Sequence, residues 1–336
     1  MGNSMKRRVI KQGHNTLTLT LPSEWAKKHG IKAGDELNIT EREKSIVVSA
    51  EGNGFIPAST TIDVTGLSSP LIWRYILSAY RAGYDEIAVT GIGSGKRAVY
   101  SAFSYNTLDY LKDGYKSNVS ALDMGPMETV SAAVNRLIGM EIIEQKQNYC
   151  LIKDLSEVTD KEFDNTLRRI FALLQTETEN IQDGFSGKKE GAKSIHIVDT
   201  NLDRFEDFCF RVLNKKGHSS MRKTNTMHSL IFTLELVGDE LKKIAMHMLE
   251  NNLKYSDMVK ELFDTQKRQI ERFYKLFYKF DRQLAVEIYN ADAESTKQAA
   301  KYYKHLSDDE KEFLHHFKKI GIYVLSLTEL RIDMEF

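Results

Sequence analysis

Apolar and polar residues alternate strictly in residues 16–21, where Thr and Leu take turns. This period of two predicts a half-buried β-strand, which Pro22 ends. Residues 23–30 then have the pattern of one or two helical turns, with Ser23 as the N-cap and Gly30 as the left-handed C-cap. The chain therefore begins with a small β-rich module that contains one short helix.

The middle of the chain mixes the periodicities of strands and helices, which indicates a small α/β or α+β connector. Up to residue 155, the pattern predicts further strands at residues 36–40, 44–49, 61–64, 86–90 and 141–153. It predicts helices at residues 69–82, 98–112 and 127–137.

Beyond residue 158 the periodicity is helical throughout, and no proline follows Pro126. Short turns between the helices predict an antiparallel all-α bundle. Residues 233–239 and 327–333 both contain Glu-Leu-x-x-Asp, which indicates two three-helix repeats. The six expected helices lie near residues 160–183, 199–214, 224–251, 256–280, 283–304 and 308–334.

Composition limits the possible classes of protein. The 336 residues are 41% hydrophobic and 28% charged, which predicts a globular chain of two or three domains. Cys150 and Cys209 are the only cysteines, so no disulfide framework or zinc knuckle is expected. Because no apolar stretch approaches the length of a membrane span, we expect a cytoplasmic protein without membrane insertion. No nucleophile motif or HExxH motif is present, so we expect no enzyme.

One glycine-rich segment, residues 90–97, lies between a predicted strand and a predicted helix, the usual context of a phosphate-binding loop. Thr90 and Arg97 stand where a Walker A loop needs Gly and Ser or Thr. A tight turn is the favoured interpretation, and anion binding is the alternative.

Positive charge is concentrated at the start of a chain whose formal net charge is +0. Residues 1–32 contain seven Lys and Arg residues against one acid, Glu24. Such a cluster can neutralise DNA phosphates. On charge alone, a solvated edge strand protected by basic residues is the favoured interpretation.

The order of predicted elements in this basic segment is a second observation. Residues 11–25 and 30–37 form a basic strand, a Gly-containing turn, a strand ending in Pro, a short helix, Gly-Ile and a Gly-Asp turn. This order resembles the AbrB/SpoVT swapped-hairpin family, in which two chains form one interleaved β-barrel that lies on DNA. The resemblance implies a homodimer, and it implies DNA contacts by Lys6, Arg7, Arg8, Lys11, Lys27 and Lys28.

Two carboxylate pairs recur in the helical repeats. Glu235 and Asp239 are four residues apart, as are Glu329 and Asp333, so each pair lies on one face of a helix. Like charges at this spacing repel each other unless water screens them or a cation bridges them. A solvated helix face and a metal site are therefore both open.

Residues 234–240 resemble the Leu-Glu-x-x-Gly-Asp signature of the PhoU family of phosphate-uptake regulators, whose members bind metal clusters through such motifs. Asp203 and Asp207 resemble the acidic second-helix segment of that family. The second repeat departs from the signature because it lacks Gly-Asp. By resemblance, these acids are metal ligands, and oxygen ligands suit Mg, Ca, Mn or Fe(III).

Together the two resemblances indicate an archaeal type of phosphate-uptake regulator. The expected domains are residues 1–52, 55–155 and 156–336: a DNA-binding and dimerisation module, the connector and the helical domain. The predicted function is DNA-binding transcriptional regulation of phosphate uptake, with the helical domain sensing metal, phosphate or a partner. The alternative is an interaction protein that controls a phosphate transporter or signalling protein without binding DNA. An antitoxin-like role is a third possibility.

Overall fold

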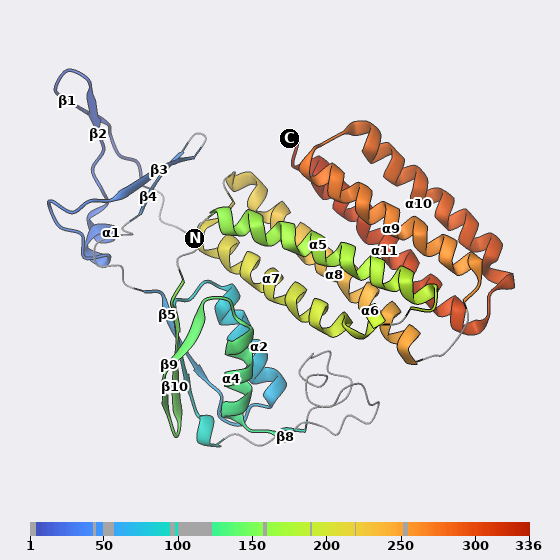
Figure 1. Cartoon of the computed structure of the whole chain (residues 1–336). Helices are drawn as coiled ribbons and strands as arrows, with labels where there is room; N and C mark the ends of the chain where they lie inside the picture. Colours follow the sequence, from blue (N-terminus) through green and yellow to red (C-terminus); the bar gives the residue numbers. More distant parts are fainter. Residues whose placement is uncertain are drawn as a thin grey trace. The chain divides into compact units, whose positions relative to one another are not determined.

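The computed structural model describes residues 5–42, 45–49, 57–94, 98–99, 123–156, 160–188, 190–218, 220–250 and 255–336. The chain divides into two compact units, Met1–Pro57 and Ala58–Phe336. The second unit contains both the α/β region and the helices (Figure 1).

Two β-hairpins and one short helix make up the N-terminal unit. Strand β1 (Ile10–Gln12) pairs antiparallel with β2 (Thr16–Thr18), and β3 (Asn38–Arg42) pairs antiparallel with β4 (Ser45–Ser49). Helix α1 (Ser23–Lys28) lies between the hairpins in the sequence. Among the described residues, the hairpins form two separate two-stranded sheets.

This unit has no core of its own in the part that the structure describes. None of the side chains described between residues 5 and 49 is buried. Leu17, Ile39 and Ile46 are 71%, 68% and 67% exposed, although strands normally bury such side chains on one face. A module this small cannot bury enough apolar surface alone.

The second unit begins with a four-stranded sheet in the order β5-β6-β10-β9. Its strands are β5 (Ser59–Asp63), β6 (Glu86–Thr90), β9 (Met140–Lys146) and β10 (Tyr149–Asp154). Strands β5 and β6 are parallel, and β10 is antiparallel to both of its neighbours. Figure 1 shows α2 (Ser69–Arg81) and α4 (Pro126–Arg136) side by side along this sheet. Helix α2 is the crossover that a parallel pair requires.

Most sequence-based boundaries in this region agree with the structure, but two differ. The strand predicted at residues 141–153 is a hairpin, because polar Gln147 and Asn148 form a turn that lets β9 pair with β10. Of the helix predicted at residues 98–112, Ala98–Val99 are strand β7, which pairs with β8 (Asp123–Met124). Residues 100–112 lie outside the described residues.

The glycine-rich segment begins with a tight turn. Gly91 has φ 78°, and a Cβ at this position would lie 2.3 Å from Thr65 Oγ1. Glycine is therefore required there by both the backbone and the close approach. Residues 92–94 form one turn of 3₁₀ helix, and residues 95–97 lie outside the described part of the chain.

The six predicted long helices are confirmed. They are α5 (Asp160–Phe185), α7 (Ile195–Lys216), α8 (Thr224–Glu250), α9 (Asp257–Tyr278), α10 (Arg282–Tyr302) and α11 (Asp308–Asp333). A short helix that the pattern did not predict, α6 (Glu190–Lys193), lies between α5 and α7. Ser307 begins α11 with a capping box, in which its hydroxyl accepts from Glu310 N at 3.3 Å.

One continuous apolar core joins the two three-helix repeats. Its fully buried residues come from both repeats, including Phe171 and Leu234 in the first and Phe263 and Phe313 in the second. Helix α8 packs against α11, which places the last helices of the two repeats in contact (Figure 1). Within the described residues, no helix is long and apolar enough to cross a membrane.

Candidate nucleic-acid interface and buried acidic cluster

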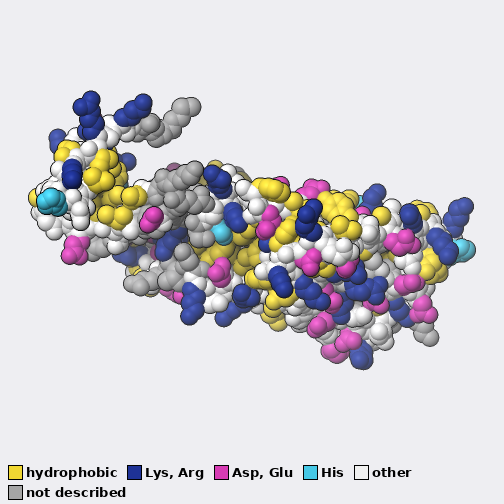
Figure 2. Space-filling model, turned by 90° about the horizontal axis from the view of Figure 1, so that it is seen from above, with side chains coloured by type: hydrophobic (Ala, Val, Ile, Leu, Met, Phe, Trp, Pro, Cys, Tyr) yellow, Lys and Arg dark blue, Asp and Glu magenta, His cyan; other side chains and the backbone are white. Residues whose placement is uncertain are grey.

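The predicted DNA-contacting cations lie on the N-terminal unit. Lys6, Arg7 and Arg8 precede β1, and Lys11 lies within it; all four are exposed. Lys27 and Lys28 end helix α1, where cations also complement the helix dipole. Figure 2 shows Lys and Arg side chains projecting from this unit next to uncovered hydrophobic side chains. The unit thus presents the two properties that a paired, phosphate-binding module requires.

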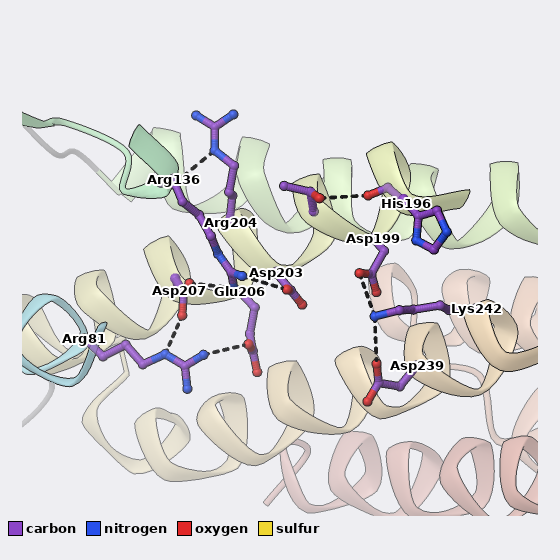
Figure 3. A network of polar contacts seen from close by, with 11 residues as sticks. Arg81, Arg136, His196, Asp199, Asp203, Arg204, Glu206, Asp207, Asp239 and Lys242 are labelled. Carbon is purple, nitrogen blue, oxygen red and sulfur yellow. Dashed lines mark hydrogen bonds and ion pairs between the residues drawn. The ribbon is translucent and has the colours of Figure 1, made fainter. Parts of the chain in front are cut away.

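The acidic residues predicted in the first repeat lie along α7 and α8, whose facing surfaces are shown in Figure 3. Spacings of four place Asp199, Asp203 and Asp207 on one side of α7. Asp239 comes from α8. The fold therefore brings together the two acidic segments that the sequence predicted to cooperate.

A lysine of the chain itself lies among these carboxylates. Lys242 Nζ is 2.8 Å from Asp199 Oδ2 and 3.9 Å from Asp239 Oδ1. Burial lowers the pKa of Lys242, but Asp199 and Asp239 outweigh burial, so the net pKa is raised. Lys242 is therefore a built-in counter-ion, which sequence reasoning missed although it follows Asp239 by three residues.

Two arginines of the α/β region also pair with the acids of α7. Arg136 lies 2.9 Å from Asp203 Oδ2 and 3.1 Å from Asp207 Oδ2. Arg81 Nε donates to Asp207 Oδ1, and its Nη2 is 3.1 Å from Glu206 Oε2. Asp203 and Asp207, predicted as metal ligands, thus also fasten the α/β region to the bundle.

Two carboxyl groups resist ionisation in the acidic cluster of α7 and α8, which consists of Asp199, Asp203, Asp207, Glu235 and Asp239. Burial raises the pKa of Glu235 to about 8, with a further contribution from Asp239. Burial and Asp203 raise the pKa of Asp199 to about 7. Because burial and like charge both disfavour the carboxylate, a bound cation would relieve the cost of ionisation.

Glu177 on α5 adds a carboxyl group that the sequence analysis did not single out. It is 0% exposed, and neither carboxyl oxygen has a hydrogen-bond partner among the described residues. Burial raises its pKa well above the usual range, and Asp199 raises it further. In the sequence, Glu177 could have been noticed only because it is a charged residue at a position where the helical pattern of α5 calls for an apolar one.

The donor set fits a hard cation in its chemistry, because carboxylate oxygens are the ligands that Mg²⁺, Ca²⁺ and Mn²⁺ prefer. As arranged here, however, the described residues contain no group of three or more His, Cys, Asp or Glu side chains placed to hold a metal ion. Among the described residues, Lys242, Arg136 and Arg81 pair with carboxylates of the cluster.

The acids predicted in the second repeat have a different setting. Glu329 and Asp333 are exposed on α11, and Glu329 Oε1 accepts from Tyr289 Oη at 3.1 Å. The facing part of α10 supplies Ala285 and Val286 to an apolar hollow beside them. The first repeat thus brings several carboxylates together, whereas in the second repeat the corresponding helices place apolar side chains beside Glu329 and Asp333.

The buried contact between the α/β region and α7 is also held by Arg211. This residue is 0% exposed; its guanidinium lies 2.7 Å from Asp154 Oδ2 and donates to Tyr80 O at 2.9 Å. Lys215 also pairs with Asp85 at the same contact. Sequence patterns could not predict these pairs, because Arg211 is 131 residues from Tyr80 along the chain.

Taken together, fold and surface define a class of protein with an uncovered basic β-hairpin module, followed by an α/β region and a six-helix bundle with a buried acidic cluster. Residues 10–55 match the protein-family model described as antidote-toxin recognition MazE, bacterial antitoxin.

A solved structure similar to this chain is the phosphate transport system regulatory protein PhoU from Streptococcus pneumoniae. The similarity has a TM-score of 0.40 and 17% sequence identity, and it covers 52% of this chain and 96% of that chain. A search of curated proteins found no match.

Proposed function

We propose that this chain is a cytoplasmic, homodimeric, DNA-binding transcriptional regulator of phosphate uptake. The proposal gives the β module the role of holding DNA and the helical domain the role of sensing metal, phosphate or a partner protein. It assigns no catalytic reaction to the chain.

One observation carries the DNA-binding part. The N-terminal unit, of which residues 10–55 match the MazE family model, exposes both its apolar strand residues and its cations, so pairing of two such units would bury the first and align the second. Two copies would present eight cations from Lys6, Arg7, Arg8 and Lys11 to one duplex, and phosphate contacts of this kind supply most non-specific affinity. The phosphate part rests on the resemblance of residues 234–240 to the PhoU signature.

The test is binding of the full-length protein to DNA from upstream of its own phosphate-transport genes. We expect Arg7→Ala/Arg8→Ala to weaken binding at least tenfold. The matched control is Lys297→Ala/Lys301→Ala, which removes the same charge from exposed positions on α10 and should leave binding nearly unchanged. Absence of binding at physiological salt, or equal losses in both variants, would favour the interaction protein that regulates a transporter directly.

We further propose that the acidic cluster of the first repeat binds a divalent cation. The observation that favours it is Glu177, a fully buried carboxyl without a hydrogen-bond partner among the described residues. Asp199 and Asp239 lie close enough to add to the rise of its pKa. Glu235, Asp239, Asp203 and Asp207 are the candidate ligands, and a cation would compete with Lys242 for them.

Manganese uptake by the purified protein tests this proposal. Glu235→Gln/Asp239→Asn should lower the bound manganese, whereas Lys242→Met should raise the affinity several-fold because it removes the competing ammonium. Glu329→Gln/Asp333→Asn is the matched pair of changes on an exposed helix face and should cause the smaller loss. Equal manganese content in wild type and the Glu235/Asp239 variant would reject the site.

A further inference from the structure

Asp207 of α7 has both carboxylate oxygens occupied by arginines of the α/β region (Figure 3). Its Oδ1 accepts from Arg81 Nε, and its Oδ2 lies 3.1 Å from Arg136 Nη2. Arg136 also lies 2.9 Å from Asp203 Oδ2. Asp203 and Asp207 are candidate ligands of the cation site proposed above, so the two arginines and a cation compete for the same carboxylates.

Arg136 depends on these carboxylates in its present position. Its side chain is 10% exposed, and its Nε has no hydrogen-bond partner among the described residues. Burial lowers the pKa of Arg136, but Asp203 and Asp207 outweigh burial, so the net pKa is raised. Because a buried charge without a partner is strongly destabilising, Arg136 must move into water when Asp203 and Asp207 take another partner.

The same residue fixes the end of α4 to α7. Arg136 is the last residue of α4, and its carbonyl oxygen accepts from Arg204 Nε at 3.1 Å (Figure 3). The side chain and the main chain of one residue thus both hold α4 in place. Departure of the guanidinium removes the two ion pairs and loosens the end of this helix.

A second group of contacts holds the α/β region farther along α7. Arg211 lies 2.7 Å from Asp154 Oδ2. Gly83 approaches Lys215 so closely that a Cβ at Gly83 would lie 2.5 Å from Lys215 Cγ. None of these four residues is a candidate cation ligand. The α/β region therefore stays anchored at this point when the end of α4 moves.

The docked arrangement leaves one buried acid unmatched. Glu177 of α5 is 0% exposed, and its carboxyl oxygens have no hydrogen-bond partner among the described residues. Asp199 and Asp239 lie close enough to add to the rise of its pKa. A cation on the acidic cluster would meet this extra negative group, which the arginines do not reach in the docked arrangement.

We propose that Arg136 is a gate between the acidic cluster and the α/β region. While Arg136 pairs with Asp203 and Asp207, the cluster is closed and α4 is docked on α7. When a divalent cation is bound there, Arg136 is displaced and the end of α4 separates from α7. The inference rests on the cation site proposed above and is independent of DNA binding.

The gate also gives cation binding a route to the rest of the chain. The α/β region begins at Ala58, directly after the N-terminal unit ends at Pro57. A change in the docking of this region therefore acts on the segment that joins the proposed DNA-binding module to the helical bundle.

Trp73 of α2 is a built-in reporter of the gate. It is 3% exposed, and the guanidinium carbon of Arg136 lies 5.9 Å from the centre of its ring. Trp25 is the only other tryptophan, so full-length Trp25→Phe emits from Trp73 alone. We expect manganese to raise the acrylamide quenching constant of Trp73 by about twofold or more, because a bound ligand shifts the population toward the open state.

Manganese affinity gives a second, independent measurement. Arg136→Met removes the competing guanidinium but keeps a long apolar side chain, so the affinity should rise by about fivefold or more, the lower end of usual coupling between sites. Arg74→Met removes an exposed arginine from α2 and should leave the affinity unchanged. The Trp73 measurement keeps Arg136 intact, so it decides the question even if Arg136→Met does not fold.

Manganese uptake without a change in Trp73 quenching, or equal affinity in Arg136→Met and wild type, would overturn the gate and leave the cation site standing. A rise in quenching that persists in Glu235→Gln/Asp239→Asn would also overturn it, because the effect would then arise outside the acidic cluster. No manganese uptake by wild type or by Arg136→Met would reject the cation site and the gate together.

Discussion

At the scale of single residues, buried ion pairs join the α/β region to the helical bundle, and sequence patterns do not reveal them. The spacing of Asp203 and Asp207 predicted that they share one helix face, and both lie on α7. Their partners Arg81 and Arg136 could not be predicted, because no periodicity links residues that are 71 and 126 positions apart. Acids that resemble metal ligands in sequence can thus also hold the α/β region against the helical bundle.

Arg211 offers a direct test of this anchoring. Arg211→Ala leaves the buried Asp154 with only Lys215, 3.5 Å away, as a cationic partner, and breaking a buried pair costs about 3–5 kcal/mol. Urea unfolding followed by circular dichroism should show this loss. Arg74→Ala, an exposed arginine on α2, should change the free energy of unfolding by less than about 0.5 kcal/mol. Similar values for the two variants would contradict the anchoring role.

The same pair predicts a pH dependence. Burial raises the pKa of Asp154, but hydrogen bonds from Arg211 and Ser156 outweigh it, so the net pKa is lowered from 3.8. A lowered folded-state pKa stabilises the fold above the unfolded-state value, and this stabilisation is lost as the pH falls through the folded-state value. Asp154→Asn should therefore cost about 3 kcal/mol at pH 7 and progressively less below about pH 4.

Unfolding free energies of wild type and Asp154→Asn at pH 7 and pH 3 check this expectation. Asp164→Asn is the control, because Asp164 is exposed on α5. A difference between Asp154→Asn and wild type that is as large at pH 3 as at pH 7 would rule out the proposed role of this carboxylate.

At the scale of elements, the hydrophobic periodicity predicted helices and strands well wherever it continued over several helical turns or strand residues. The long helices of the bundle and strand β6 were predicted within a few residues. The hairpin of β9 and β10 was missed because its turn, Gln147 and Asn148, lacks the Gly or Pro that usually marks a turn. The groove lined by residues of α9, α10 and α11 could not be predicted, because it depends on three helices packing together.

We predict that the hairpins of the N-terminal unit hold two copies of the chain together. Ile39 of β3 and Ile46 of β4 are exposed in the single chain, and a second copy would cover them. Ile39→Asp/Ile46→Asp should therefore convert a dimer into a monomer in sedimentation experiments and weaken DNA binding with it. Phe232→Asp, an exposed apolar position on α8, should leave the dimer intact. A wild-type monomer would contradict the pairing.

At the scale of the whole molecule, charge is distributed unevenly although the formal net charge is +0. Seven of the Lys and Arg residues lie within the first 32 positions, opposite a single acid. The helical body holds many of its charges in internal pairs, such as Lys242 with Asp199 and Arg136 with Asp203. Attraction to DNA should therefore come from the N-terminal unit alone, and it should be strongly dependent on salt.

The salt dependence of DNA affinity tests the regulator account most directly. If a dimer presents Lys6, Arg7, Arg8 and Lys11 from both copies, about eight phosphates are met, and log K should fall with log salt at a slope near −7. Lys11→Ala should reduce this slope by about 2, one contact per copy, while weakening all DNA sequences similarly. An affinity that is independent of salt, or a slope that Lys11→Ala leaves unchanged, would contradict the account.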